Sequence, residues 1–569
     1  MDSPGTAILE RDDDRRTRSG AASGPLLIVA VLALTLFVGL LPFASTLIIH
    51  HPDERHYSDG AAIMLETGDW LTPRTGAGEV RVRKPPLTYW IEAAGMTVAG
   101  IGPLGARLGN LLLGAAMLPL VYLLARTAGG GRQTALLSAA LLAGNLVFIL
   151  STLHALPDQA LTFGLLVSAI GFTGLLFRPE PAGRYAWLAY GGLAVGVLAK
   201  GFLPVAFLVY TVGFALLHVG TGRRRLWQPL PILACLLLSC GWFVYQSLNQ
   251  PAGMADQLLY DQLVNKLRGI GPGTMLSSLV SGLTGLIAPN ALVLLALAYG
   301  LRRGERPSLS EIGGAARYFL GWCALIVLIF TFSAYSTHRY VLPAVPLVTV
   351  LAATAMQSLA AGPAAALLRA AFKATLALAT LLLVGLLVVS TAILPAWQGL
   401  GLIVLALAGA ALIWRLVGSP SLPVAAAAMS VLPNGLLFLA FPVFGALFLP
   451  DVGKALATAL RQAQAGYERT LFVGDEMTAA QTRLHLGTGR GFHQAERLGE
   501  VEDFSRFAIV ATDKRELADA LEATGYARAE VRAGWRDIHG YDFRAGLARW
   551  DLAAQREKNA KLGYVLTRP

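Results

Sequence analysis

The chain has 569 residues, of which 55% are hydrophobic and only 14% are charged. Soluble domains carry roughly 25% charged residues, so this composition excludes an ordinary soluble protein. The net charge of +11 does not indicate a nucleic-acid partner, because the basic residues gather in short loops between apolar segments. The cysteines, Cys235, Cys240 and Cys323, lie inside apolar segments and form neither a disulfide framework nor a metal-ligand pattern.

The first element is a polar segment at residues 1–24, which we expect to be a disordered cytoplasmic tail. Apolar segments of about 17–25 residues follow, which is the length that a helix needs to cross a bilayer. We therefore predict a polytopic α-helical membrane protein with about thirteen transmembrane helices within residues 25–449. They are expected at residues 25–49, 104–125, 133–153, 159–177, 185–200, 202–219, 229–248, 276–300, 318–335, 340–359, 374–395, 401–417 and 422–449.

The loops between these segments fall into two sets. Short loops rich in arginine and lysine favour the cytoplasmic side. They hold Arg126 and Arg132, Arg178 and Arg184, Arg223–Arg225, Arg302–Arg317, Arg369–Lys373 and Arg415. The outer set holds residues 50–103, 154–158, 249–275 and 336–340, Lys200, and everything after about residue 450. No charged residue lies in the middle of an expected span, which disfavours an ion-coupled transporter and indicates chemistry at the outer boundary of the membrane.

The outer loop 50–103 begins with HPDERHYSDG, which places Asp53 and Glu54 directly after the first span. SDGAAIMLETGDW has apolar residues at helical spacing, so we expect an amphipathic helix lying on the membrane. In RKPPLTYW two prolines restrict the backbone after Lys84. Taken singly, Asp53 and Glu54 could be solvated loop charges, and Lys84 could be an anchor to lipid phosphate. The combination favours a functional site, because a carboxylate pair and a cation with a restricted backbone share one loop.

The ordered motifs of the outer loops resemble a known family. DERHY, MLETGDWLTPR and RKPPLTYW are followed by ALPD (155–158), GLAVGVLAKG (192–201) and FSAYSTHRYVLPAVP (332–346). This order resembles undecaprenyl-phosphate-sugar glycosyltransferases of the GT-C type, above all the lipid A aminoarabinose transferases (ArnT), which are related to the protein O-mannosyltransferases. The resemblance covers the first 350 residues or so. The chain departs from the family's pattern at Arg83, usually acidic, and at His338 and Arg339, which stand where a lysine is usual.

The resemblance implies a sugar donor on undecaprenyl phosphate, and lipid A or another envelope acceptor, at the periplasmic face of a bacterial inner membrane. Asp53 would then be the general base, and Glu54 a second carboxylate, a sugar ligand or a partner of Arg55. The donor phosphate would be bound by Lys84, Arg268, Arg339 and Tyr340, with Lys266 competing for the role of Arg268. Supporting residues would be Arg55, Tyr57, Asp158, Lys200 and His338. Headgroup anchoring by membrane lipids explains each cation equally well.

Asp158 follows His154 by four residues, a spacing that also allows a metal pair. We prefer a supporting role in which Asp158 orients Lys84 or the Asp53 loop. No cofactor is required, because lysine and arginine can stabilise a departing monophosphate. The use of a divalent metal ion stays an open alternative. Alternatives are another sugar, a protein acceptor, a transporter of lipid-linked sugars, or a scaffold for envelope assembly.

Residues 450–569 have the composition of a soluble domain. RTLFVGD and RFAIVATD are typical of short strands, and KRELADALEATG of a helix that ends at Gly525. This alternation predicts a small periplasmic α/β domain. FVGDE lacks the glycine-rich phosphate-binding fingerprint, so a cap over the acceptor groove is the expected role.

Overall fold

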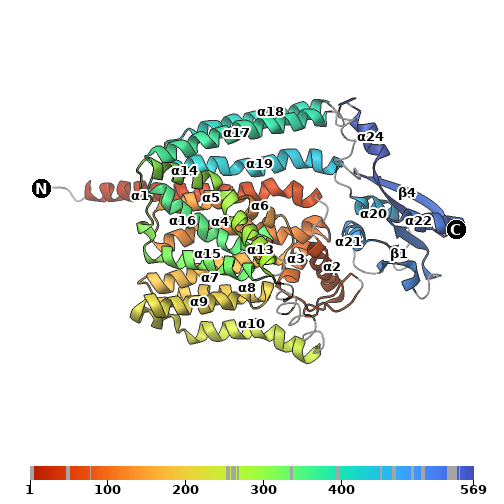
Figure 1. Ribbon diagram of the computed structural model, residues 1–569, viewed down its shortest axis with the longest axis horizontal. Helices are drawn as coiled ribbons and strands as arrows, with labels where there is room; N and C mark the ends of the chain where they lie inside the picture. The colour runs from red at the N-terminus through yellow and green to blue at the C-terminus, as the bar shows by residue number, and fades with distance from the viewer. Residues whose placement is uncertain are drawn as a thin grey trace.

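The computed structural model of the protein has two parts, a bundle of long helices and a smaller α/β domain at one end of the bundle (Figure 1). It describes residues 6–46, 52–76, 78–250, 257, 264, 268, 270–333, 337–391, 396–448, 451–463, 470–487, 492–501, 506–534, 548–549 and 551–568. The predicted fold class, a polytopic helical membrane protein with a C-terminal α/β domain, is confirmed.

The bundle helices follow the expected apolar segments. They are α1 (Thr6–Thr46), α4 (Pro103–Ala128), α5 (Arg132–Ala143), α6 (Leu146–Thr152), α7 (Pro157–Phe177), α8 (Ala182–Lys200), α9 (Leu203–His218), α10 (Pro229–Asn249), α13 (Pro272–Ile287), α14 (Ala291–Arg302), α15 (Gly314–Thr331), α16 (Val345–Gln357), α17 (Pro363–Ser390), α18 (Ala396–Val417) and α19 (Leu422–Phe448). Short 3-10 helices are η1 (Gly220–Leu226), η3 (Ala288–Asn290), η4 (Ser310–Ile312) and η5 (His338–Ala344).

The expected number of thirteen spans is not confirmed. In the described part of the chain, ten segments are long and apolar enough to cross a membrane, and the bent pair α5 and α6 makes eleven. The helix α9 has 16 residues and measures about 24 Å, which is shorter than the hydrocarbon core of roughly 30 Å.

At the N-terminal end of the described chain, α1 already begins at Thr6. Its first turns are therefore helical where a disordered tail was expected.

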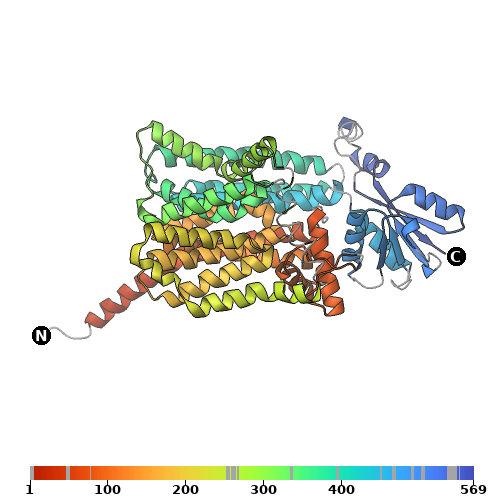
Figure 2. The ribbon, with the colours of Figure 1, turned by 60° about the horizontal axis from the view of Figure 1, so that its bottom comes forward.

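The two sets of loops lie at opposite ends of the bundle. At one end, Arg178 Nε donates to the carbonyl of Thr127 at 2.7 Å, and Glu311 accepts from the amide of Gly131 at 2.6 Å. The other end carries α2 (Pro52–Thr67), α3 (Leu87–Ala99) and the C-terminal domain, as Figure 2 shows. This arrangement agrees with the sorting of the loops from their charges.

Close packing of α7 against α8 sets the geometry at that second end. A Cβ atom on Gly171 would lie 2.1 Å from the amide nitrogen of Ala189, and one on Gly192 would lie 2.4 Å from that of Ser168. The two backbones can approach this closely only because these positions carry no side chain. As the helices are antiparallel, the start of α7 and the end of α8 meet at the end that carries α2.

The helix α2 confirms the predicted amphipathic helix but does not lie on the membrane. Ala61 and Met64 are 0% and 1% exposed. Ala61 belongs to a hydrophobic cluster with Ala93 of α3 and Leu484 of the C-terminal domain. The apolar face of α2 is therefore buried inside the protein, between the bundle and the C-terminal domain.

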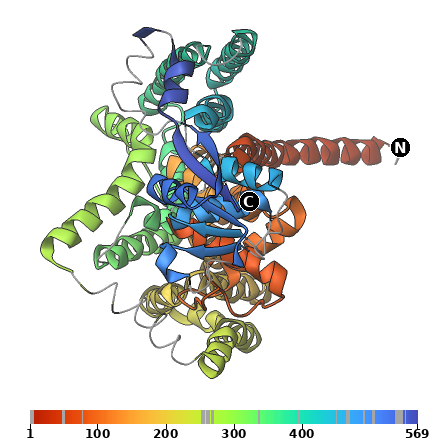
Figure 3. The ribbon, with the colours of Figure 1, turned by 90° about the vertical axis from the view of Figure 1, so that its right-hand side faces the viewer.

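The C-terminal domain contains a five-stranded mixed sheet in the order β2-β1-β3-β5-β4. The strands are β1 (Thr470–Val473), β2 (Phe492–Ala495), β3 (Ile509–Thr512), β4 (Ala527–Ala533) and β5 (Lys561–Thr567), and the helices are α20 (Val452–Gln462), α21 (Glu476–Leu486), α22 (Arg515–Ala523) and α24 (Leu552–Lys558). Strand β1 pairs in parallel with β2 and β3, whereas β5 is antiparallel to β3 and β4. Figure 3 shows this domain over the centre of the bundle's end.

Candidate functional site

Five of the predicted site residues meet at the end of the bundle next to α2, and we call them the charged cluster: Asp53, Asp158, Lys200, Arg339 and Tyr340. They come from α2, α7, α8 and η5. Lys200 Nζ lies 2.5 Å from Asp158 Oδ1. Arg339 lies between the two carboxylates, with Nη2 3.3 Å from Asp53 Oδ2 and Nε 3.9 Å from Asp158 Oδ2. Two carboxylates and two cations are thus in direct contact.

The members of the charged cluster differ in exposure. The side chain of Asp53 is 53% exposed, whereas that of Asp158 is 6% exposed. The Tyr340 ring lies beside both cations, 4.4 Å from Lys200 Nζ and 5.7 Å from Arg339 Cζ. Such contacts stabilise a cation without neutralising it. Asp53 is open to a substrate, and the buried Asp158 holds the cations in place.

Local sequence explains how α7 and α8 present Asp158 and Lys200. Pro157 occupies the first turn of α7, where no backbone amide partner is lost, and Asp158 beside it is favoured by the positive end of the helix dipole. Lys200 is the last residue of α8, and Gly201 ends this helix with φ +85°. Because residues with a side chain rarely adopt this conformation, glycine allows the sharp turn that leaves Lys200 at the end of α8, beside Asp158.

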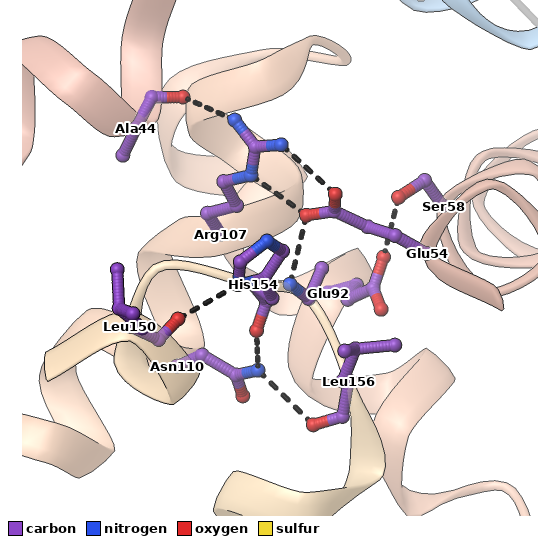
Figure 4. A network of polar contacts seen from close by, with 10 residues as sticks. Ala44, Glu54, Ser58, Glu92, Arg107, Asn110, Leu150, His154 and Leu156 are labelled. Carbon is purple, nitrogen blue, oxygen red and sulfur yellow. Dashed lines mark hydrogen bonds and ion pairs between the residues drawn. The ribbon is translucent and has the colours of Figure 1, made fainter. Parts of the chain in front are cut away.

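Beneath α2, Glu54 enters a buried network that Figure 4 shows. Its oxygens accept from Arg107 Nε at 2.7 Å and Nη2 at 2.9 Å, and Oε1 also accepts from the amide of Ala155 at 2.9 Å. Both side chains are 0% exposed. The suggested partnership of Glu54 with Arg55 is therefore wrong, since Arg55 instead pairs with Glu476 of the C-terminal domain.

Burial raises the pKa of Glu54, but the charge and hydrogen bonds of Arg107, with smaller contributions from His154 and the Ala155 amide, lower it overall. Glu54 is therefore an ionised carboxylate whose hydrogen-bonding capacity is directed into the protein. This environment suits a residue that positions its neighbours.

The network continues to the turn before α7. Arg107 Nη1 donates to the carbonyl of Ala44 at 3.2 Å, and Asn110 Nδ2 donates to the carbonyls of His154 and Leu156 at 2.6 and 3.2 Å. This turn leads directly to Asp158, so the network supports both carboxylates of the charged cluster. Sequence reasoning missed Arg107 and Asn110, although polar residues in an otherwise apolar helix are a recognisable signal of buried pairing.

A second layer around α2 involves Tyr57 and Glu92. The Tyr57 ring is 3% exposed and lies 5.1 Å from the ring of Tyr89, whose hydroxyl accepts from Arg81 Nη1 at 2.8 Å. Ser58 Oγ donates to Glu92 Oε2 at 2.9 Å, and burial raises the pKa of Glu92 well above its usual range. Tyr57 therefore supports the packing of α2 on α3 and has no access to substrate.

The remaining predicted cations lie elsewhere. Lys84 is half-buried before α3. Asp158 contacts Lys200 and Arg339, and Arg339 also contacts Asp53, so Asp158 is linked to the Asp53 loop, one of the two supporting roles expected for it. Arg268 is exposed, and its competitor Lys266 lies outside the described residues.

The pairing of His154 and Asp158 as metal ligands finds no support in their contacts. His154 Nδ1 lies 2.7 Å from the carbonyl oxygen of Leu150, and Asp158 is paired with the two cations. Among the residues that the structure describes, no group of three histidine, cysteine or acidic side chains is arranged to hold a metal ion.

Two adjoining cavities lie beside the charged cluster, and we call them together the groove. The first, about 230 Å³, is lined by Asp158 and Arg339 and by apolar residues of α6. The second, about 370 Å³, is lined by apolar residues of α6 and η3 and by Ser281, Thr284 and Gly285 of α13. Val147, Leu150 and His338 line both cavities. The groove is therefore charged at one end, and apolar residues of α6 and η3 form much of the rest of its lining.

The C-terminal domain contacts the opposite face of α2. Arg483 of α21 is 1% exposed, and its Nη1 lies 2.7 Å from Asp59 Oδ1. Its Nη2 donates to the carbonyl of Gly76 at 3.3 Å and to Gln494 Oε1 at 3.2 Å. A Cβ atom on Gly76 would lie 2.3 Å from Arg483 Nη1, so only glycine fits there without a shift. We call these contacts and the Arg55–Glu476 pair the domain junction.

Comparison with known proteins agrees with this fold. The sequence profile of the family described as dolichyl-phosphate-mannose-protein mannosyltransferase matches residues 27–249. An uncharacterized protein of Aquifex aeolicus is 28% identical over 54% of this chain and 59% of its own length. The undecaprenyl phosphate-alpha-4-amino-4-deoxy-L-arabinose arabinosyl transferase of Edwardsiella ictaluri is 27% identical over 58% of this chain and 59% of its own length. The matched region thus spans about three fifths of each relative.

The crystal structure of ArnT from Cupriavidus metallidurans bound to undecaprenyl phosphate superposes with a TM-score of 0.68 at 17% identity. It covers 95% of this chain and 97% of that chain. The apo structure of the same protein gives a TM-score of 0.67 at 18% identity. These likenesses establish the fold, and the sequence matches confirm the resemblance to ArnT-like and mannosyltransferase-like proteins of the GT-C type.

Proposed function

We propose that this protein is an integral-membrane glycosyltransferase that transfers aminoarabinose or a similar sugar from undecaprenyl phosphate to lipid A or a similar envelope acceptor. The observation that carries the proposal is the charged cluster at one end of the groove. A polyprenyl-phosphate sugar is an amphiphile with one anionic group and a long apolar chain, and the groove offers both environments. The named aminoarabinosyl relatives and the ArnT complex with undecaprenyl phosphate support this donor.

The reaction would take place at the periplasmic face of a bacterial inner membrane. The arginine-rich loops lie at the end of the bundle opposite the charged cluster, and such loops favour the cytoplasm.

The proposed chemistry is a single displacement that inverts the anomeric carbon. The acceptor oxygen forms a bond to the anomeric carbon while Asp53 accepts the proton of the acceptor hydroxyl. Where the acceptor is already an anionic phosphate, Asp53 orients it. The carbon–oxygen bond to the donor phosphate breaks, and undecaprenyl phosphate leaves with the electron pair. Arg339 and Lys200 stabilise the departing phosphate, Tyr340 donates a hydrogen bond to it, and Lys84 and Arg268 add positive charge.

Within this mechanism Glu54 has a different role from Asp53. Its oxygens are occupied by Arg107 and the Ala155 amide, so we assign to Glu54 the positioning of Asp53 rather than contact with substrate.

The decisive experiment combines mass spectrometry of lipid A and undecaprenyl-linked sugars with the Asp53→Asn variant. Cells that produce the wild-type protein should carry a sugar on lipid A that cells without it lack. Asp53→Asn should lower transfer by about 100- to 10,000-fold without loss of folded protein, because only the general base is removed. Glu79→Gln, an exposed carboxylate of the same loop, is the matched control and should retain activity. Full transfer by Asp53→Asn would refute the assignment of the base.

A protein acceptor is the second candidate, and the match of residues 27–249 to the protein mannosyltransferase profile favours it. In that case lipid A would be unchanged, and envelope proteins would lose a glycan in cells without the protein. Glycopeptide mass spectrometry of the same cells separates the two candidates.

A further inference from the structure

A second cavity lies at the arginine-rich end of the bundle, opposite the charged cluster. Its volume is about 450 Å³, which is within the range of roughly 300–1,000 Å³ for small-molecule sites. It is lined by Leu208, Val212 and Leu216 of α9, by Ile232 of α10 and by Tyr190 of α8. The last turn of α9 leads into the arginine-rich η1, so this end of the cavity lies near the boundary between lipid and water.

The three consecutive arginines beside this cavity, Arg223–Arg225, differ in their contacts. Arg225 donates to the backbone carbonyls of Arg178 and Glu180, and the Tyr190 hydroxyl donates to the carbonyl of Leu226 at 2.6 Å. These bonds fix η1 against the neighbouring loop. Arg223 and Arg224 are exposed and line the cavity. Throughout the described part of the chain, no acidic side chain forms an ion pair with either of them.

Trp227 indicates the depth of this site in the membrane. It also lines the cavity, and it is 81% exposed. Exposed tryptophan is enriched where the headgroups begin. The two unpaired arginines therefore lie at headgroup level, and the apolar walls extend from them toward the hydrocarbon core.

We propose that this cavity binds an anionic phospholipid, with one acyl chain between α9 and α10 and its phosphate at Arg223 and Arg224. Basic pockets between transmembrane helices bind anionic lipid headgroups. A soluble anion would find no favourable contact with the apolar walls. A lipid without net charge would leave the two positive charges uncompensated. The site is separate from the charged cluster and does not depend on the proposed glycosyl transfer.

The test measures lipid binding to the purified full chain by native mass spectrometry with phosphatidylglycerol and phosphatidylethanolamine as probes. Wild-type protein should retain phosphatidylglycerol in preference to phosphatidylethanolamine. The double variant Arg223→Gln/Arg224→Gln should weaken phosphatidylglycerol binding by roughly 30-fold, because each of the two arginines contributes a factor of about five to six. The matched control is Arg302→Gln/Arg306→Gln, two exposed arginines that do not line this cavity.

A second variant, Val212→Trp, fills the cavity without changing its charge and should also displace phosphatidylglycerol. This variant keeps the proposal testable if the double arginine variant does not fold. Equal binding of both lipids, an equal loss in the control, unchanged binding in Val212→Trp, or displacement of the lipid by inorganic phosphate alone would each overturn the proposal.

Discussion

The surroundings of Asp53 and Glu54 can be compared directly, because the two carboxylates are neighbours at the start of α2. Asp53 is half-exposed and shares Arg339 with Asp158, whereas Glu54 is fully buried with Arg107. A step of about 100° along the helix separates the exposed carboxylate from the buried one. The comparison teaches that a pair of acidic residues in a motif does not imply two equivalent roles, and that burial distinguishes them.

The largest effect should come from breaking the buried network. Glu54→Gln leaves Arg107 buried without its counter-charge, which should lower the free energy of unfolding by about 3–5 kcal/mol. Thermal unfolding of the purified protein measures this loss, and Asp53→Asn should unfold like the wild type. The double variant Glu54→Leu/Arg107→Met should recover much of the stability, because it removes both charges. An unchanged unfolding temperature in Glu54→Gln would show that the pair is not structural.

A smaller effect is expected at the domain junction. Asp59→Asn removes the charge that faces Arg483, but Gly76 and Gln494 still accept from this arginine. The expected cost is about 1–3 kcal/mol, and it should appear as faster hydrogen exchange in α21. Asp69→Asn serves as the control, since Asp69 accepts from the amide of Thr72 within the loop. Equal exchange in both variants would indicate that the junction does not anchor α2.

Acidification should test the face of α2 that carries His56. Burial, with the nearby charges of Arg81 and Arg55, lowers the pKa of His56 from its usual 6.5 to about 4. The unfolded chain therefore binds a proton between pH 6.5 and 4 that the folded chain does not, so stability should fall as the pH drops through this range. His56→Gln should flatten this part of the pH profile of thermal unfolding. An unaltered profile in the variant would assign the acid sensitivity to other groups.

The smallest effect should come from the Arg55–Glu476 pair, whose side chains are 19% and 40% exposed. Arg55→Gln should cost about 0–1 kcal/mol, because exposed ion pairs contribute little. The remaining difference from the wild type should vanish in 1 M salt, which screens such pairs. A cost above this range that persists in salt would make Arg55 part of the buried support.

The sequence predicted the two-part fold and five members of the charged cluster, because hydropathy and the ordered motifs report directly on membrane helices and outer loops. It did not predict that Glu54 pairs with Arg107, which lies 53 positions away and faces α2 only after α4 has packed. It also placed the apolar face of α2 on the membrane. A stripe of alanine and methionine looks the same whether lipid or the C-terminal domain covers it, so this distinction required the tertiary structure.

The contact between Arg483 and the carbonyl of Gly76 joins residues that are 407 positions apart. At translation rates of 5–20 residues per second, the loop around α2 leaves the ribosome roughly 20–80 seconds before its partner exists. During that interval α2 is anchored only from the side of the bundle. The domain junction can therefore form only when synthesis is nearly complete. A chain that stopped before α21 would contain the charged cluster, but α2, which carries Asp53, would lack its contacts with the C-terminal domain.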